Sequence, residues 1–212
     1  MTTSTPRARR ARGSLTADAI LDAAERAAAG GIEAMTVRTI AAELDASPMS
    51  LYRYFATMDE LVDGLLDRVL GRFVAPAATD DWVGDLGAFA QAHRAVLVAH
   101  PWAVPALFTH PSPGQNATRI GEEALAIVGR GGVTGTDAVV LFSAVLALNY
   151  GWSAFTSARS RVPQDALAAG LAAIPAEVYP HTASVAAELA GYGSDAHYEA
   201  ALATLLRGVA TR

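Results

Sequence analysis

Side chains able to bind phosphates and base edges gather in residues 36–55, which read TVRTIAAELDASPMSLYRYF. An arginine guanidinium can meet guanine O6 and N7 with two hydrogen bonds, and hydroxyl groups can bind phosphate oxygens. Small polar and flexible apolar side chains can meet thymine methyl groups or base edges. This chemistry predicts contact with DNA, and the candidate residues are Thr36, Arg38, Ser47, Pro48, Met49, Ser50, Tyr52, Arg53 and Tyr54.

Several of these residues also have a purely structural interpretation. Arg38 could be an ordinary exposed arginine on a helix, and Thr36 and Ser47 could serve only as helix caps. The two tyrosines could be partly buried. Leu51 and Phe55 in the same stretch are apolar, and we predict that they belong to the core that holds the neighbouring side chains in place.

A second group of residues, in the C-terminal half, has the composition of a small-molecule pocket. Such pockets are mainly apolar and aromatic, with a few polar anchors, although aromatic residues at helical spacing can equally be plain core. His93 and Asn149 are the sharper candidates, because each lies in an apolar stretch and needs a hydrogen-bond partner if buried. The full candidate set is Phe89, His93, His100, Trp102, Phe108, His110, Asn116, Phe142, Asn149, Trp152 and Phe155.

Motifs of catalysis are absent from the sequence. The chain has no Cys, which excludes a disulfide, a thiol nucleophile and a cysteine-based zinc site. It has no Gly-x-Ser-x-Gly, no phosphate-cradling glycine loop and no His-Glu-x-x-His. His93 and His100 lie two helical turns apart, too far to ligate one metal ion by themselves. We therefore expect no enzyme activity, no metal and no cofactor.

Positive charge is concentrated at the N-terminus, although the net charge of the chain is -5. For binding to nucleic acid, the distribution of charge matters more than its sum. Residues 1–15 are predicted to form a basic disordered arm that contacts phosphates or a minor groove. A solvated tail without that role is the alternative. The arginines that precede the first acid, Asp18, are Arg7, Arg9, Arg10 and Arg12.

Two short helices joined by a turn are predicted to hold the DNA-contact candidates. Thr36 can cap the first helix, the pair Asp45-Ala46 makes the turn, and Ser47 can cap the second. Pro48 suits the first position of that second helix, where no backbone donor is needed. The arrangement predicts a helix-turn-helix whose second helix carries Ser50 and the residues up to 55.

Two further helices are predicted on either side of this pair. Thr16 can cap an earlier helix that Gly30-Gly31 ends. Thr57 and Glu60 fit a capping box that opens a later helix reaching about Val74. Apolar residues recur every four positions in this later helix and mark a buried stripe. They are Leu61, Leu65, Val69 and Phe73.

The rest of the chain also reads as helix, without strand alternation, so an all-α fold is predicted. Residues 101–114 are expected to be irregular or to hold one short helix, and residues 161–181 to be loop-rich because of their prolines. The other predicted helices are 81–99, 115–129, 136–160, 183–189 and 195–210. The predicted domains are the arm 1–15, a DNA-binding domain 16–60, and an effector-binding and dimerisation domain 61–212 that begins with a connecting helix, 61–75.

The longest apolar stretch is residues 138–148, AVVLFSAVLAL, interrupted only by Ser143. It is shorter than the roughly 20 residues that span a bilayer. A helix this apolar must be buried on most sides, either within one chain or against a second copy. We expect a soluble, cytoplasmic protein that makes no membrane contact.

The N-terminal pattern resembles the tetracycline-repressor-like (TetR) family of bacterial transcription regulators. It covers residues 20–66, which read ILDAAERAAAGGIEAMTVRTIAAELDASPMSLYRYFATMDELVDGLL. Residues 81–159 resemble the tetracycline-repressor type of C-terminal domain. One position departs from the family pattern. Met58 stands where the family often has a phosphate-binding lysine, and Asp59 and Glu60 follow, so we expect a weaker phosphate contact there.

The resemblance implies an all-helical homodimer that binds double-stranded operator DNA and a small-molecule effector. The dimer interface would be a four-helix bundle from residues 136–160 and 195–210 of each subunit. We expect a repressor released from a pseudo-palindromic operator by an effector that the sequence does not identify. Three alternatives stay open: an activator, a helical small-molecule-binding protein with a vestigial DNA-binding domain, and a helical enzyme.

Overall fold

Helices and their connections make up all of the chain that the structure describes. This computed structural model describes residues 15–110, 114–160 and 163–210, and within these ranges it contains no strand, so the predicted all-α class is confirmed. The chain divides into two compact units between Leu61 and Val62. Each unit is described by itself below.

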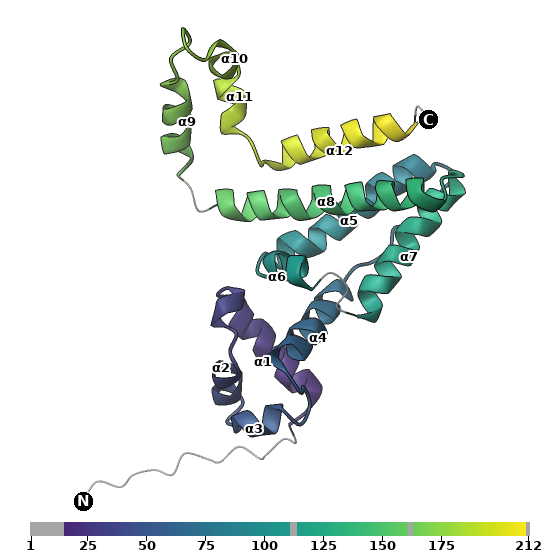
Figure 1. The fold of residues 1–212 in the computed structure, drawn as a ribbon, viewed down its shortest axis with the longest axis vertical. Coiled ribbons are helices and arrows are strands. Elements are labelled where there is room, and N and C mark those ends of the chain that lie inside the picture. Colours follow the sequence, from purple (N-terminus) through teal and green to yellow (C-terminus); the bar gives the residue numbers. More distant parts are fainter. Residues whose placement is uncertain (1–14, 111–113, 161–162, 211–212) are drawn as a thin grey trace, which may run out of the picture. The chain divides into compact units, whose positions relative to one another are not determined.

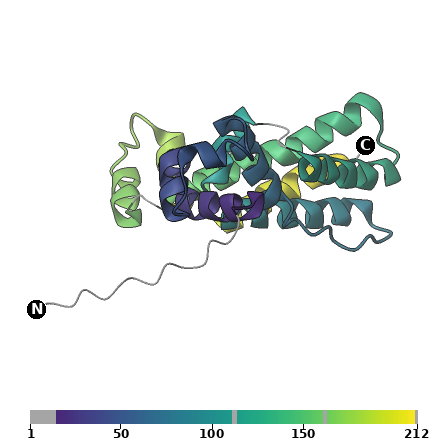
Figure 2. The same cartoon turned by 90° about the horizontal axis from the view of Figure 1, so that it is seen from below.

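The N-terminal unit is a small group of helices around a buried apolar centre (Figures 1 and 2). The side chains of Ile20, Ile40 and Leu51 are almost completely buried and join its helices. Burial of such apolar side chains is the main force that holds short helices together. The helices are α1 (Ala17–Ala28), η1 (Ile32–Ala34), α2 (Val37–Glu43), α3 (Pro48–Leu51) and the first residues of α4 (Met58–Leu70).

Local caps fix where these helices begin, as the sequence predicts. The Thr16 hydroxyl accepts a hydrogen bond from the Ala19 amide at 3.1 Å. Thr36 caps α2 in the same way through the Thr39 amide, at 3.1 Å, while the Thr39 hydroxyl accepts from the Thr36 amide at 2.9 Å. Reciprocal bonds of this kind satisfy two backbone donors that a helix start leaves without partners.

The start of α4 departs slightly from the predicted capping box. The Thr57 hydroxyl accepts from the Glu60 amide at 3.0 Å, as expected. The Glu60 carboxylate, however, accepts from the amide of Ala56 at 2.6 Å. The Glu60 side chain therefore accepts a hydrogen bond from the residue before Thr57, not from the amide of Thr57 itself.

Two helices in this region end earlier than the sequence predicts. Helix α3 ends at Leu51, and Tyr52 to Tyr54 form a turn that the Tyr54 amide closes by bonding the Leu51 carbonyl at 2.9 Å. Helix α4 ends at Leu70, not near Val74. The residue after Leu70 is Gly71, a poor helix former, and the next amides bond carbonyls three residues back, which tightens the chain out of the α-helix.

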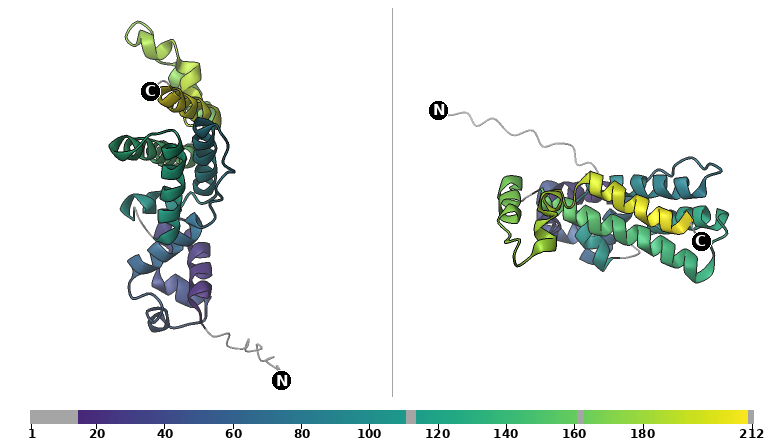
Figure 3. Two further views of the ribbon diagram at one scale, coloured as in Figure 1. Left: turned by 90° about the vertical axis from the view of Figure 1, so that its right-hand side faces the viewer. Right: turned by 90° about the horizontal axis from the view of Figure 1, so that it is seen from above.

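The C-terminal unit is built on the longest helix, α8 (Gly135–Arg159). Helices α5 (Trp82–Ala99) and α7 (Gln115–Arg130) pack against it, and α6 (Ala103–Thr109) contacts it as well. The last helix, α12 (Asp195–Ala210), lies along α5 and α8 (Figure 3). The bounds of these helices agree with the predicted ranges to within one or two residues.

Residues 161–181 are not loop-rich as predicted, since helix α9 (Gln164–Ala172) lies within them. The segment QDALAAGLA is rich in alanine and leucine, the strongest helix formers, and this outweighs the flanking prolines. The helix predicted at 183–189 is α11 (Ala186–Ala190), preceded by the short α10 (Pro180–Ala183). Helices α9 and α11 pack against each other beyond the end of α8 (Figure 1).

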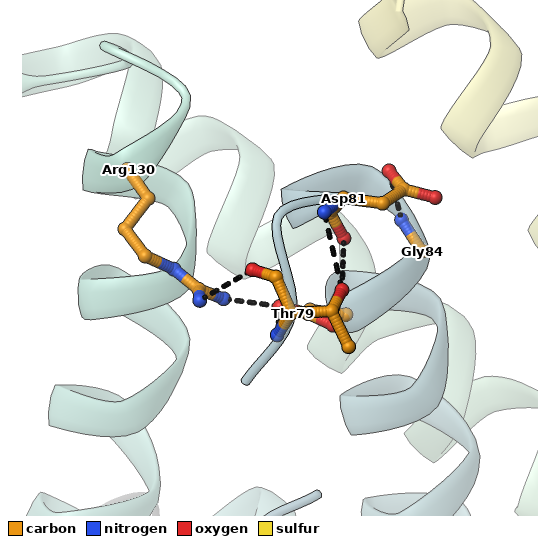
Figure 4. A network of polar contacts seen from close by, with 5 residues as sticks. Thr79, Asp81, Gly84 and Arg130 are labelled. Atoms are coloured by element: carbon orange, nitrogen blue, oxygen red, sulfur yellow. Dashed lines mark hydrogen bonds and ion pairs between the residues drawn. The ribbon is translucent and has the colours of Figure 1, made fainter. Parts of the chain in front are cut away.

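A polar clasp joins the start of α5 to the end of α7. The Asp85 carboxylate, which is buried, accepts from the Thr79 amide and hydroxyl, both at 2.8 Å, and from Arg130 Nη2 at 2.5 Å. Arg130 also donates to the Thr79 carbonyl, while Asp81 caps α5 through the Gly84 amide (Figure 4). The two Thr79 hydrogen bonds and the Arg130 guanidinium lower the pKa of Asp85, which keeps the carboxylate charged.

The turn at Gly131 and Gly132, before the long helix α8, has a steric reason. Gly132 has a φ of 75°, the left-handed region that favours glycine. A Cβ atom at Gly131 would lie 2.2 Å from the Trp82 ring, so no larger residue fits there. The turn therefore lets the end of α7 pack against Trp82, the first residue of α5.

Helix α8 is the one helix of the described residues that is long and apolar enough to cross a bilayer by length and composition. Core helices of soluble proteins meet the same test. Here α8 contacts α5, α6, α7 and α12 and carries the buried polar side chains Asn149 and Ser153. These contacts are those of a helix at the centre of a helical unit.

Candidate DNA-contact surface and effector cavity

The nine DNA-contact candidates form an exposed surface on the N-terminal unit. Eight of them are exposed and Ser50 is half-buried. Met49 is 73% exposed, a large value for an apolar side chain. Leu51, predicted as core, is buried, and Phe55 is half-buried. The local fold therefore leaves the predicted DNA-contact residues at the surface and turns the predicted core residues inward, as expected from the sequence.

The turn between α2 and α3 has an unusual backbone. Asp45 has a φ of 50°, in the left-handed region, where aspartate is among the few tolerated residues. The Ala46 amide then bonds the Ala41 carbonyl at 2.9 Å. This bond holds α3 at the end of α2, so the exposed residues of the two helices belong to one compact motif.

Ser47 does not cap α3 as predicted. It occupies the N-cap position without a capping hydrogen bond from its side chain. Its Oγ lies 2.8 Å from the Ser50 Oγ instead. The Ser47 hydroxyl therefore accepts no hydrogen bond from the backbone amides at the start of this short helix, whose first turn contains Pro48. The Ser50 amide instead bonds the Ser47 carbonyl at 2.9 Å, so it is not left free for a phosphate oxygen.

Arg38 and Arg53 supply the positive charge of this surface. Both are exposed, and neither has an acidic partner among the residues that the structure describes. Thr36 differs, because its hydroxyl is already used as the cap of α2. The arrangement can place two guanidinium groups, small polar groups and the Tyr52 hydroxyl against one nucleic-acid backbone or groove.

Tyr54 contacts the base of the N-terminal arm. Its hydroxyl donates to the carbonyl of Leu15, the first residue that the structure describes. Its ring is 40% exposed, so it remains at the surface. The arm predicted at residues 1–15, with its four arginines, lies outside the described residues except for Leu15.

A cavity of about 250 Å³ lies within the C-terminal unit, between α4, α5, α7 and α8. Its walls are mainly apolar, and its polar groups come from His93, Thr118 and Tyr150. This is the composition expected of a small-molecule site. The residues that line it are Leu70, His93, Ala117, Thr118, Ile120, Gly121, Phe142, Leu146 and Tyr150.

His93 and Phe142 are the two predicted pocket residues that line this cavity. Asn149 lies directly behind His93, with its Nδ2 atom 3.0 Å from His93 Nδ1. Phe89 is fully buried and stacks on His93 at a ring distance of 6.2 Å. Phe89 and Asn149 therefore contact His93 without lining the cavity themselves.

The other predicted pocket residues have partners elsewhere in the unit. His100 bonds Arg72 and the Val96 carbonyl, and Trp102 meets the His100 ring edge-on at 6.4 Å. Phe108 is 62% exposed and lies 6.0 Å from the Tyr150 ring.

At the far end of α8, two more of the predicted pocket residues turn toward the segment before α12. Trp152 donates to the Ser194 carbonyl at 3.1 Å. Phe155 contacts Tyr192 at a ring distance of 5.3 Å.

His110 and Asn116 bind α4. His110 Nδ1 lies 2.6 Å from Asp63 Oδ1. The Asn116 amide nitrogen and its side chain donate to the Asp67 carboxylate at 2.7 Å and 2.9 Å. Asp67 therefore caps the start of α7 from another helix. Through these bonds α4 is tied to both α6 and α7, on the side where Leu70 lines the cavity.

The wall of the cavity contains seven residues that the sequence analysis missed. Phe142, Leu146 and Tyr150 follow one another at four-residue spacing on α8 and so share one helix face, a signal available from the sequence. The small residues of α7 gave no comparable signal. The missed residues are Leu70, Ala117, Thr118, Ile120, Gly121, Leu146 and Tyr150.

Asn149 is the centre of a buried polar network. Its Nδ2 donates to the Ala90 carbonyl at 2.9 Å, and its Oδ1 accepts from the Tyr198 hydroxyl at 2.8 Å. Burial lowers the pKa of His93 to about 4 and raises that of Tyr198 to about 12, so both stay uncharged near neutral pH. Arg94, 4.2 Å from the Tyr198 ring centre, completes the contact of α5 with α12.

Two models of protein families match this chain. Residues 20–65 match the model described as bacterial regulatory proteins, tetR family, and residues 75–212 match the tetracyclin repressor-like, C-terminal domain. The chain is 35% identical over 138 residues to the HTH-type transcriptional repressor DrrR1 of Streptomyces coeruleorubidus. That match covers 64% of this chain and 50% of DrrR1, so the chain spans about half the length of this relative.

Solved structures share the fold. ActR of Streptomyces coelicolor, solved in complex with actinorhodin, superposes with a TM-score of 0.84 over 94% of this chain and 98% of ActR. The identity is 24%, a level that shows the fold alone. BioQ, solved with its natural double-stranded DNA operator, is 26% identical, with a TM-score of 0.61 over 69% of this chain and 90% of BioQ.

Proposed function

Because this chain belongs to the tetR family of bacterial regulatory proteins, we propose that it is a sequence-specific transcriptional regulator. It acts in the cytoplasm as a homodimeric repressor, and a small-molecule effector releases it from a pseudo-palindromic operator. Its function is binding, not catalysis. The resemblance stated from the sequence is thereby confirmed at the level of the family.

The exposed helix-turn-helix surface is the observation that carries this proposal. Arg38 and Arg53 stand exposed with no acidic partner among the described residues. A surface of this kind suits the backbone and base edges of a major groove. The repressor DrrR1 and the operator-bound BioQ are relatives that support the same role.

Helices α8 and α12 supply the proposed dimer interface. Val139 and Val140 on α8 are 56% and 55% exposed, although helices of this composition are normally buried. A second copy that packs on this face and on α12 would remove these side chains from water. The homodimer would present two recognition surfaces to half-sites one helical turn apart.

Helix α4 is the proposed connection between effector and DNA. It runs without a break from Met58, near the DNA-contact surface in sequence, to Leu70 in the cavity wall. An effector can shift DNA affinity only if it binds one arrangement of the protein better than the other. Contacts of the cavity with α4 give the effector a means to do this.

Selection of bound sequences from a random DNA pool tests the proposal. We expect a pseudo-palindromic site to emerge. The double variant Arg38→Ala/Arg53→Ala should then bind that site at least about 30-fold more weakly, because each lost base contact costs on the order of 1–3 kcal/mol.

A matched control removes the same amount of charge elsewhere. Arg72→Ala/Arg119→Ala also loses two exposed arginines, both outside the helix-turn-helix and outside α8 and α12, and should keep nearly full affinity. If no sequence is selected, the protein is better explained as a small-molecule-binding protein with a vestigial DNA-binding domain. Unchanged binding of the Arg38/Arg53 variant would reject the assigned surface.

A further inference from the structure

The side-chain amide of Asn149 determines which nitrogen of His93 carries the proton. The Ala90 carbonyl can only accept, so the group that faces it at 2.9 Å must be the Asn149 NH₂. The same NH₂ group lies 3.0 Å from His93 Nδ1. Tyr198 donates to the remaining Asn149 oxygen. His93 Nδ1 must therefore accept, and in a neutral imidazole the proton is then on Nε2.

The Nε2–H group is the part of His93 left for the cavity. The His93 ring lines the cavity wall, while its Nδ1 is turned to Asn149. No hydrogen bond of Nε2 to another described residue is found. An N–H donor at the wall of a mainly apolar cavity needs an acceptor, and a bound molecule can provide it.

The rest of the cavity wall is uncharged. No Asp, Glu, Lys or Arg lines it. Burial lowers the pKa of His93 to about 4 and raises the pKa of Tyr150, so both remain neutral near pH 7. An ion that entered would lose its hydration without gaining an opposite charge, which is strongly unfavourable.

The lining of the cavity favours a planar aromatic molecule. The rings of His93, Phe142 and Tyr150 all contribute to the wall, and the remaining side chains are small or aliphatic. Aromatic rings stack with other aromatic rings in preference to leaving apolar area in water. The volume of about 250 Å³ suits a molecule of two or three fused rings.

We propose that this cavity binds an uncharged, planar aromatic molecule that carries a carbonyl-type oxygen, and that this oxygen accepts a hydrogen bond from His93 Nε2. The Tyr150 hydroxyl is the second polar anchor. This assignment rests on the proposed effector function and specifies its ligand class. Anionic aromatic acids are excluded as good ligands, although they share the same ring system.

A matched set of tricyclic probes tests the assignment by calorimetric titration of the whole protein without DNA. The probes are 9-fluorenone, fluorene, which lacks the oxygen, and 9-fluorenone-4-carboxylate, which adds a charge. We expect 9-fluorenone to bind about tenfold more tightly than fluorene, the effect of one buried hydrogen bond. The carboxylate should bind at least about tenfold more weakly than 9-fluorenone.

Two substitutions of His93 isolate the donor. His93→Phe keeps an aromatic ring without the N–H group and should abolish the preference for 9-fluorenone over fluorene. His93→Gln retains an N–H donor and should keep part of it. Gln91→Ala, on the exposed side of the same helix, is the control and should leave the preference unchanged. Circular dichroism checks that each variant is folded.

The comparison of the three probes on the unaltered protein does not depend on any variant. Equal or tighter binding of fluorene, tightest binding of the carboxylate, or no binding of any probe would overturn the assignment. So would a preference that persists in folded His93→Phe. Operator selection uses no ligand, so a selected operator without probe discrimination rejects this ligand class alone. Probe discrimination without a selected operator rejects the regulator function and retains the cavity chemistry.

Discussion

At the scale of single residues, Asn149 has the widest influence. Its amide uses both donors and its oxygen to satisfy Ala90, His93 and Tyr198, and so connects α5, α8 and α12. Polar groups inside an apolar unit are tolerated only when they are paired in this way. The network also orients His93 at the cavity wall, where burial lowers its pKa and keeps it neutral.

Acid should destabilise the protein through His93. In the folded chain its pKa is lowered by burial from 6.5 to about 4, so the unfolded chain binds the proton more readily in this range. The contribution of neutral His93 to stability is therefore fully present above its pKa in the unfolded chain, 6.5. It is lost as the pH falls toward its pKa in the folded chain, about 4. The expected loss is about 3 kcal/mol, and most of it should be visible between about pH 7 and pH 4.5 in urea unfolding.

The variant His93→Phe is the comparison for this prediction. A phenylalanine takes up no proton, so its unfolding free energy should change much less over the same range. The Asp85 carboxylate does not contribute to the change in unfolding free energy over this range, because its pKa is lowered from 3.8. Parallel pH profiles for the two proteins would contradict the role given to His93.

At the scale of elements, two carboxylates of α4, both within the C-terminal unit, join this helix to its neighbours α6 and α7. Asp63 pairs with His110 at the end of α6, and Asp67 caps the start of α7 through Asn116. Both aspartates lie on the helix that also brings Leu70 to the cavity. Movement at the cavity can therefore reach α4 through α7.

Asp67→Ala should loosen the start of α7. The loss of a capping carboxylate costs about 1–2 kcal/mol, and the Asn116 amide loses its acceptor. Hydrogen exchange followed by mass spectrometry should show faster exchange in the first turn of α7. On the proposed function, the effector should also release DNA less completely.

Asp80→Ala, an exposed aspartate in the connection before α5, is the control for that change. It should leave exchange in α7 unaltered. Equal protection of the first turn of α7 in Asp67→Ala and the unaltered protein would show that this cap does not hold the helix.

At the scale of the whole molecule, the exposed apolar face of α8 requires an explanation. Val139, Val140, Ser143 and Ala147 are exposed along the side of α8 that its neighbours leave open. Small residues also face outward on α12, among them Ala200 and Ala203. Small and apolar side chains let two helix pairs approach closely, which fits a four-helix interface between two copies.

Val139→Glu/Val140→Glu should turn the proposed dimer into a monomer. Two charges on this face would have to be buried without partners, at a cost of several kcal/mol. Light scattering coupled to size-exclusion chromatography should report a dimer for the unaltered protein and a monomer for the variant. Operator affinity should fall with it.

A charge change at two exposed apolar positions outside this face provides the control. Val178→Glu/Val185→Glu lies in the segment around α10 and should remain dimeric. An unaltered protein that elutes as a monomer would reject the interface, and so would a dimeric Val139/Val140 variant.

Much of this protein could be predicted from its sequence because the signals are local. Thr16 and Thr36 cap helices through amides three residues away, and apolar residues repeat along α1 and α4 at helical spacing. These interactions depend only on neighbours along the chain. They were enough to predict the all-α class and the helix-turn-helix, while the family was predicted from the resemblance of residues 20–66.

Tertiary structure alone decided how the cavity is built. Asp67 caps a helix through the amide of Asn116, 49 residues later, and Asn149 orients a histidine 56 residues earlier. Ser47 bonds Ser50 instead of capping, and α3 ends after one turn, because packing and competing partners outweigh local preference. Which side chains reach the cavity depends on how α4, α5, α7 and α8 pack together, and no spacing within a single helix contains that information.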